Sequence, residues 1–147
     1  MILISHRGNT NGPTPAIENN PNQIMEVLNS GYDVEIDVWY IDQKWYLGHD
    51  KADYKIEEDF LEQPGLWCHA KNLQAASKMS LNKKIHWFWH ENDKITITSK
   101  GFIWAHPGFQ PLSESIAVMP ETLKETVSHA IGVCSDYIEE YKNGKQT

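Results

Sequence analysis

The sequence predicts one α/β domain over residues 1–147, built as a compact, reduced TIM-type (β/α) barrel with about seven or eight parallel strands. Apolar segments of strand length alternate with helical or loop segments, an order typical of parallel β/α units. Many predicted strands end in a polar or charged cluster, and β/α barrels build their sites at the carboxyl ends of their strands. A typical barrel has about 250 residues, so several connecting helices must be shortened or missing here.

The predicted strands are apolar segments bounded by turn-forming residues. They lie at residues 2–5, 33–39, 45–48, 66–71, 85–90, 95–98, 102–106, 115–119 and 130–135. Residues 45–48 follow a turn near residues 42–44 and are predicted as a hairpin return strand. Three closures are open for such a short barrel: a seven-strand ring, a ring completed by a hairpin strand, or a partial barrel sealed by homodimerisation.

Two helices are predicted from their caps and apolar spacing. Asn20 and Pro21 begin the first helix, and Gly31 ends it. Asn72 caps the second helix, which runs through Met79. Composition further predicts one helical turn within residues 53–61, a helix over residues 121–129 and a polar tail that frays over residues 139–147.

The composition excludes some classes of function. A net charge of −7 argues against a general nucleic-acid binder, which neutralises phosphates with Lys and Arg, but allows a small phosphate-bearing substrate. No apolar run approaches the ~20 residues of a transmembrane helix, and the N-terminus lacks the basic start of a signal peptide. We therefore expect a cytoplasmic protein without a transmembrane segment. Cys68 and Cys134 lie in apolar runs and are predicted to be buried free thiols.

Glu35 and Asp37 are the first candidate functional residues. They alternate with apolar residues in the segment 33–39, so both project from the same face of a strand. Two carboxylates this close repel each other unless a cation lies between them, and carboxylate oxygens suit Mg²⁺ or Ca²⁺. The alternative is a pair of exposed acids on an edge strand.

Other strand ends supply candidates for catalysis and binding. His6 and His49 are a candidate acid and base, since imidazole titrates nearest neutral pH. Arg7 and Lys71 could hold an anionic substrate. Taken singly, the two histidines more often have structural or surface roles, and the arginine and lysine are ordinary surface cations.

The tryptophans have two possible roles. Trp87, Trp89 and Trp104 either pack in the barrel wall or line the cavity mouth and stack on a choline-like head group.

Several short motifs occur in a fixed order along the first half of the chain. They are His6-Arg7-Gly8, Glu18-Asn19, Glu35-Ile36-Asp37, His49-Asp50 and His69-Ala70-Lys71. Together they resemble the glycerophosphodiester phosphodiesterases, within the superfamily of phospholipase-C-like phosphodiesterases. Near the C-terminus, Ser135-Asp136-Tyr137 is similar to the closing strand-end motif of that family.

The resemblance implies a single phosphodiesterase barrel domain over residues 1–147 and a hydrolase of lipid metabolism that acts on a glycerophosphodiester. In that family the equivalents of His6 and His49 are the general acid and base. The equivalents of Arg7 and Lys71 hold the substrate phosphate. A neighbouring hydroxyl of the substrate attacks phosphorus, and water can then open the cyclic phosphate that forms.

The resemblance also implies a divalent metal ion bound by Glu35 and Asp37. The family usually has an acid as third ligand where this chain has His69. Among candidate ions, Mg²⁺ or Ca²⁺ is expected from the two carboxylates, and the imidazole ligand makes Mn²⁺ or Zn²⁺ a further candidate. Glu18 and Asp50 would support the site, Glu18 either at the metal or by pairing with the neighbouring arginine.

Two other functions are consistent with these residues. One is a non-catalytic phosphate- or phosphodiester-binding module, which the change to His69 favours. The other is a metal-independent phospholipase-C-like lyase that leaves its product cyclic. The retained pair His6 and His49 argues against the binding module, because anion binding needs no acid–base couple.

Overall fold

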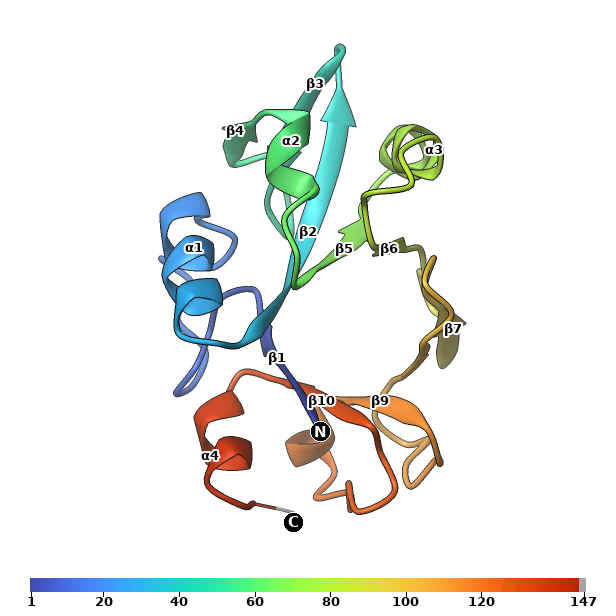
Figure 1. Cartoon of the computed structure of the whole chain (residues 1–147). Coiled ribbons are helices and arrows are strands. Elements are labelled where there is room, and N and C mark those ends of the chain that lie inside the picture. The colour runs from blue at the N-terminus through green and yellow to red at the C-terminus, as the bar shows by residue number, and fades with distance from the viewer. Residues whose placement is uncertain (146–147) are drawn as a thin grey trace.

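The fold is organised around a 10-stranded sheet that curls on itself (Figure 1). The computed structural model describes residues 1–145. Its strands are β1 (Ile2–His6), β2 (Asp33–Ile41), β3 (Lys44–Leu47), β4 (Tyr54–Ile56), β5 (Leu66–Ala70), β6 (Trp87–Phe88), β7 (Ile95–Ile97), β8 (Ile103–Ala105), β9 (Ser115–Val118) and β10 (Gly132–Ser135). Its helices are α1 (Pro21–Asn29), α2 (Glu58–Leu61), α3 (Leu73–Ser80) and α4 (Ile138–Lys142), with a 3-10 helix at Pro120–Thr122.

Parallel pairing forms most of the curled wall. The strands β6, β5, β2, β1, β10, β9 and β8 lie side by side in this order, and each neighbouring pair is parallel. β7 pairs with β8 in the antiparallel direction. β3 and β4 extend antiparallel from β2 as a branch of the sheet. The predicted combination of parallel strands and hairpin return strands is confirmed.

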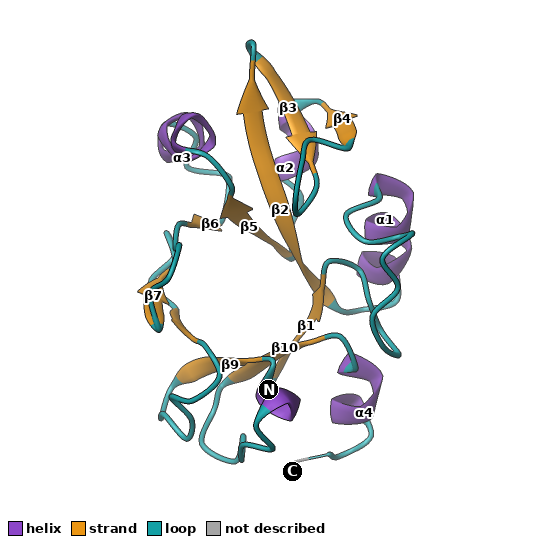
Figure 2. Cartoon of the chain, turned by 180° about the vertical axis from the view of Figure 1, so that it is seen from behind, coloured by secondary structure: helices purple, strands orange, loops and turns teal. Residues whose placement is uncertain are grey.

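The two ends of the curled sheet meet without a strand ladder between the described residues of β6 and β7. Figures 1 and 2 both show β7 coming round beside β6. The Ser99 N–H donates to the Trp87 carbonyl at 2.7 Å, and Thr96 Oγ1 donates to the Trp89 carbonyl at 3.0 Å. The sheet is therefore mixed and curled and is not a closed parallel TIM barrel, and the closure that the sequence left open involves the hairpin strand β7. β6 has only two residues, and both pair with β5, while the hairpin strand β7 pairs with β8.

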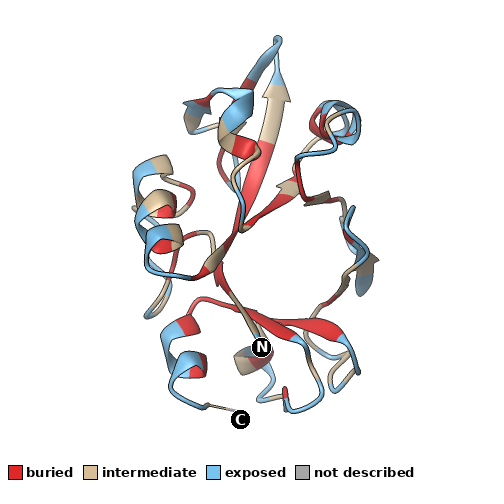
Figure 3. Cartoon of the chain, viewed as in Figure 1, coloured by how far each residue is buried: buried red, intermediate tan, exposed pale blue. Residues whose placement is uncertain are grey.

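Buried side chains form two clusters on the sheet. Figure 3 colours the buried stretches of the chain red. Inside the curl, large aromatic rings fill the space, with the centroids of Phe88 and Trp104 4.7 Å apart and those of Trp67 and Trp104 5.7 Å apart. Outside it, α1 buries Ile24 and Val27 against the sheet. A short chain can fill this interior with few side chains because each aromatic ring buries a large area.

The helix caps follow the predictions. The Asn20 side chain accepts a hydrogen bond from the Asn22 N–H at the start of α1, and Pro21 is the first residue of that helix. The Asn72 side chain accepts from the Ala75 N–H at the start of α3. Within residues 53–61, the expected helical turn is α2, and the strand β4 precedes it.

The C-terminal third departs from the prediction in two places. The expected helix over residues 121–129 is only the 3-10 helix Pro120–Thr122, because Met119 and Lys124 have left-handed φ angles of 46° and 54°. The expected fraying over residues 139–147 is wrong where α4 forms: Ile138 and Tyr141 are buried against β1 and β10. Residues 146–147 lie outside the described residues.

Two other expectations concern the chain as a whole. Cys68 and Cys134 are buried free thiols, as predicted. Within residues 1–145, no helix combines the length and the apolar character that crossing a membrane requires.

Candidate active site

A cavity of about 400 Å³ opens at the carboxyl ends of the parallel strands. The predicted catalytic, phosphate-binding and metal-binding residues all line it: His6, Arg7, Glu35, Asp37, His49, His69 and Lys71. The two predicted supporting residues contact this group, since Glu18 Oε2 accepts from Arg7 Nη1 at 3.4 Å and Asp50 Oδ1 lies 2.8 Å from His49 Nδ1. The structure thus places seven predicted site residues in the wall of one cavity and the other two in contact with them, while their roles stay predictions.

The register of three neighbouring strands sets the centre of the site. His6 on β1 is paired with Glu35 on β2, and Asp37 on β2 is paired with His69 on β5. Glu35 and Asp37 are buried, with exposed fractions of 3% and 1%. Both acids point inward from one face of β2, so the alternative of exposed edge-strand acids is wrong.

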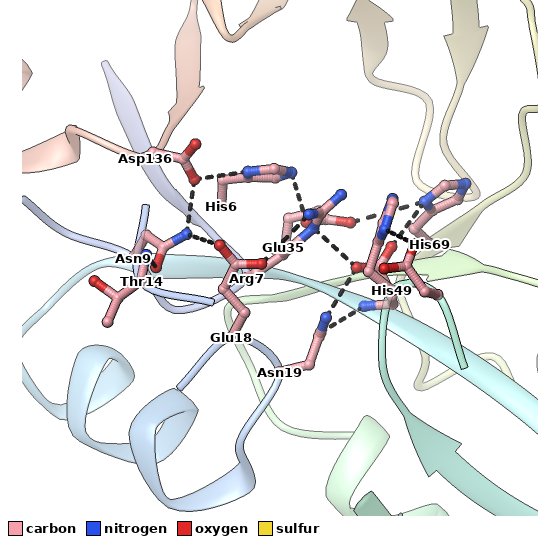
Figure 4. Close-up of polar contacts among 12 residues, drawn as sticks. His6, Arg7, Asn9, Thr14, Glu18, Asn19, Glu35, His49, His69 and Asp136 are labelled. Atoms are coloured by element: carbon pink, nitrogen blue, oxygen red, sulfur yellow. Dashed lines mark hydrogen bonds and ion pairs between the residues drawn. The ribbon is translucent and has the colours of Figure 1, made fainter. Parts of the chain in front are cut away.

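Asn19 fixes the position of Asp37 through two hydrogen bonds. Its side-chain amide donates to Asp37 Oδ2 at 2.9 Å, and its carbonyl oxygen accepts from the Asp37 backbone N–H at 2.9 Å (Figure 4). The Asn19 backbone N–H donates to the Arg7 carbonyl, and both residues have left-handed φ angles, 59° and 58°. The loop is therefore held in a conformation that is costly for most residues, which is typical of functional sites.

Glu35, Asp37 and His69 have the arrangement of a metal site. One ligand atom from each residue lies within 4.8 Å of the others. His69 Nδ1 is 3.2 Å from Asp37 Oδ1 and 3.9 Å from Glu35 Oε1. Glu35 Oε2 is buried and has no hydrogen-bond partner in the described residues. An unpartnered buried carboxylate oxygen fits a bound cation.

The hydrogen bonds of His69 also fit a cation. His69 Nε2 lies 3.2 Å from the His90 backbone carbonyl, which can only accept, so Nε2 carries a proton. Asp37 Oδ1, on the other side of the ring, also only accepts. A neutral imidazole cannot donate to both. Either a second proton on Nδ1 or a cation shared with the acids resolves the contact, and this orientation is that of a metal-ligating histidine.

Positive side chains crowd around Asp37. Arg7 Nε lies 3.1 Å from Asp37 Oδ2, and Lys71 Nζ lies 4.0 Å from Asp37 Oδ1. Burial alone would raise the pKa of Asp37, but hydrogen bonds and charges from His69, Arg7 and Asn19 outweigh it and lower this pKa well below the usual range. Asp37 is therefore a carboxylate at all ordinary pH values.

Glu35 is in the opposite situation. Burial, together with the nearby charge of Asp37, raises the pKa of Glu35. His6, His69 and Arg7 offset only part of this. A bound cation would therefore stabilise the ionised form of Glu35 more than that of Asp37.

His6 is oriented by a carboxylate that the sequence motifs left without a role. His6 Nδ1 donates to Asp136 Oδ1 at 2.8 Å, which leaves Nε2 directed toward Glu35, 3.8 Å from its Oε2 (Figure 4). Burial lowers the pKa of His6, but the bond to Asp136 and the charge of Glu35 outweigh burial and raise it. Asn9 donates to both Asp136 Oδ1, at 2.8 Å, and Glu18 Oε1, at 2.9 Å, and so links the two acids.

His49 forms a second histidine–carboxylate pair with Asp50 at the cavity rim. Its side chain is 42% exposed, and it lies in the loop after β3. The hairpin of β2 and β3 brings it to the cavity that Glu35 and Asp37 line.

The sequence motifs missed the roles of Asn9, Asn19 and Asp136. Asn19 and Asp136 were part of recognised motifs, and Asp136 also follows a strand, so both could have been assigned to the site. No pattern in the sequence distinguished Asn9.

Two further histidines, His90 and His106, line the same cavity. Burial and the neighbouring charges of His69 and His106 lower the pKa of His90 to about 4. Burial and the charges of His69 and His6 lower the pKa of His106. Both imidazoles are neutral near pH 7.

The fold and cavity define a class: a mixed α/β domain with histidines, acids and cations at the carboxyl ends of parallel strands. Comparison with protein-family models, curated proteins and solved structures finds no match.

Proposed function

We propose that this chain is a phosphodiesterase that cleaves a glycerophosphodiester-type substrate by histidine acid–base catalysis, assisted by a divalent metal ion. The main support is that two histidine–carboxylate pairs meet the candidate metal ligands Glu35, Asp37 and His69 at a single cavity. Simple anion binding explains neither pair. The motif resemblance to the glycerophosphodiester phosphodiesterases agrees with this proposal.

Arg7 and Lys71 would bind the phosphate. Both line the cavity beside the acids, and their charges compensate an anion entering a site that already contains carboxylates. A divalent ion held by Glu35, Asp37 and His69 would offset the charge that develops on the phosphoryl oxygens.

His6 and His49 would move the protons. One Nε2 accepts the proton of a substrate hydroxyl as its oxygen forms a bond to phosphorus. The other histidine donates a proton to the leaving oxygen as its bond to phosphorus breaks. The product is a cyclic phosphate and an alcohol, and water can open the ring. Asp136 and Asp50 keep the two imidazoles oriented through their Nδ1 atoms.

One observation favours a second candidate, a metal-independent phospholipase-C-like lyase. Arg7 and Lys71 already contact Asp37, so protein cations could replace part of the charge of the ion. The product would then stay cyclic. This candidate predicts activity in the presence of EDTA.

The test is turnover of bis(p-nitrophenyl) phosphate with Mg²⁺, Ca²⁺, Mn²⁺, Zn²⁺ or EDTA. We expect turnover that requires one of the ions and that falls by at least about 100-fold in His6→Gln and in His49→Gln. His129→Gln, an exposed histidine outside the cavity, is the control. Unchanged turnover in His49→Gln would contradict the acid–base assignment, and turnover in EDTA would favour the lyase.

A further inference from the structure

Asn9 is a buried polar residue whose side chain makes three hydrogen bonds. It is 1% exposed. Its side-chain Nδ2 donates to Asp136 Oδ1 at 2.8 Å and to Glu18 Oε1 at 2.9 Å. Its Oδ1 accepts from the Thr14 backbone N–H at 3.0 Å. A backbone N–H can only donate, so the amide oxygen must face Thr14, and the amino group must face the two carboxylates.

Each of these carboxylates also contacts a residue of the candidate active site. Asp136 Oδ1 accepts from His6 Nδ1 at 2.8 Å, and Glu18 Oε2 accepts from Arg7 Nη1 at 3.4 Å. A chain of hydrogen bonds therefore runs from Arg7 to His6, with Asn9 at its middle (Figure 4). Among the described residues, the cavity lining includes His6 and Arg7 but not Asn9. The Asn9 side chain can therefore act on the site only through the two acids.

The backbone of Asn9 closes the turn that carries His6 and Arg7. Its N–H donates to the His6 carbonyl at 2.9 Å, and its own carbonyl accepts from Ser5 Oγ at 2.7 Å. Arg7, inside this turn, has the left-handed φ of 58°. Such a conformation persists only where the surrounding contacts hold it. One residue therefore holds both the turn and the acids that orient the side chains of the turn.

The amino group of Asn9 is shared by two negatively charged side chains. Nearby carboxylates repel each other, and hydrogen bonds from a donor to a charged acceptor are stronger than those between neutral groups. Without this donor, Asp136 and Glu18 would lose the contact that joins them, and the side chains that they orient would move with them. A displacement of about 1 Å at a reacting group can lower a rate by about 100-fold.

We propose that Asn9 is a positioning residue that sets the separation between the proton carrier His6 and the phosphate-binding Arg7. It acts on His6 through Asp136 and on Arg7 through Glu18. The inference rests on the proposed function, because that function gives His6 and Arg7 these roles. A change of Asn9 then has two separable effects: a lower kcat through Asp136, and weaker phosphate binding through Glu18.

The test is a double-mutant cycle of Asn9→Leu with Glu18→Ala. Leucine is similar in size to asparagine but forms no hydrogen bonds through its side chain. The rate constant kcat is measured with bis(p-nitrophenyl) phosphate, and affinity is measured by calorimetric titration of inorganic phosphate. Mg²⁺ is held constant, or Mn²⁺ if Mg²⁺ does not bind. The control is Asn11→Leu, the same substitution at an exposed position of the same loop, which should leave both quantities unchanged.

We expect Asn9→Leu to lower kcat by about tenfold or more and the affinity for phosphate by about threefold or more. In the Glu18→Ala background, Asn9→Leu should still lower kcat, through Asp136, but should no longer change the affinity for phosphate. Urea unfolding checks that each variant is folded. Asn9→Ser, whose side chain is too short to bridge the two acids, serves if the leucine variant does not fold.

The outcomes separate this inference from the proposed function. Equal losses of kcat and of affinity in both backgrounds indicate a general loosening of the loop and overturn the positioning role. Unchanged kcat and affinity in Asn9→Leu overturn it as well. If the wild-type protein cleaves no diester, the phosphodiesterase is contradicted and phosphate binding decides alone. A loss of affinity that disappears without Glu18 then supports the positioning of Arg7, and any other result overturns it.

Discussion

At the residue scale, Asp37 shows how the site is assembled. A single buried carboxylate contacts side chains from two separate segments: Asn19 and Arg7 from the first loop, and His69 and Lys71 from β5 and its end. Each contact stabilises the ionised form, and together they hold the carboxylate in one orientation. A carboxylate held in this way would lose little conformational freedom on binding an ion.

Asn19→Gly tests this arrangement. Glycine keeps the left-handed φ of 59° but removes both hydrogen bonds to Asp37. We expect the free energy of unfolding to fall by about 1–3 kcal/mol and the affinity for Mg²⁺ or Mn²⁺ to fall by about tenfold or more. Urea unfolding and calorimetric titration measure these two effects. Asn22→Gly, an exposed position in α1, is the control for metal affinity. An unaltered metal affinity in Asn19→Gly would contradict the proposal that Asn19 positions Asp37 for the ion.

His86 gives a pH prediction outside the cavity that contains the acids. It is buried, with Nε2 2.7 Å from Thr98 Oγ1, and burial together with the charge of Lys100 lowers its pKa to about 4. The unfolded chain binds a proton near pH 6.5, so stability is lost as the pH falls from about 6.5 toward 4. We expect the urea midpoint to fall less steeply over this range in His86→Gln. If the urea midpoint falls equally with pH in both proteins, protonation of His86 does not cause the loss of stability.

At the element scale, adjacent parallel strands do most of the positioning. β1, β2 and β5 lie side by side, and their register puts His6 next to Glu35 and Asp37 next to His69. This part of the site followed from the sequence, because strands with polar ends in a parallel sheet bring those ends to one edge. The hairpin of β2 and β3 brings His49 to the same edge, because a short turn returns the chain beside its own strand.

The segment after β9 shows why the predicted helix at 121–129 was wrong. Composition favours a helix there, but tertiary contacts hold Glu121 in another arrangement. Glu121 accepts from Ser135 Oγ at 2.7 Å and from the Tyr141 hydroxyl at 3.2 Å. These contacts join residues far apart in the chain, so no local pattern reveals them. The contact with Tyr141 also joins this segment to α4.

α4 gives a prediction at this scale. Ile138 is completely buried against the sheet, although it begins a segment whose sequence is mostly polar. We expect Ile138→Ala to lower the free energy of unfolding by about 2–4 kcal/mol, as a truncated core residue does. Thermal or urea unfolding measures it, with the exposed Glu139→Ala expected to stay within about 0.5 kcal/mol. A loss for Ile138→Ala no larger than that of the control shows that α4 frays in solution.

At the scale of the whole molecule, the short chain keeps a barrel-like wall by changing how the wall closes. The antiparallel strand β7 lies where a parallel strand and its helix would be, and Trp67, Phe88 and Trp104 fill the interior. The sequence indicated the parallel strands and the hairpin but not the closure. The closing hydrogen bonds involve isolated residues such as Ser99, which have no distinctive sequence signal. Asp136 and His6 similarly meet across 130 positions of the chain.

The most direct test of the account is ³¹P NMR of a glycerophosphodiester incubated with the protein and a divalent ion. The proposed phosphodiesterase predicts that the diester resonance disappears and that a cyclic phosphate or a monoester resonance replaces it. EDTA and His6→Gln should each suppress the change, since the proposed reaction uses both the ion and the proton carrier. A diester resonance that persists with folded protein and with each of Mg²⁺, Ca²⁺, Mn²⁺ and Zn²⁺ contradicts the account.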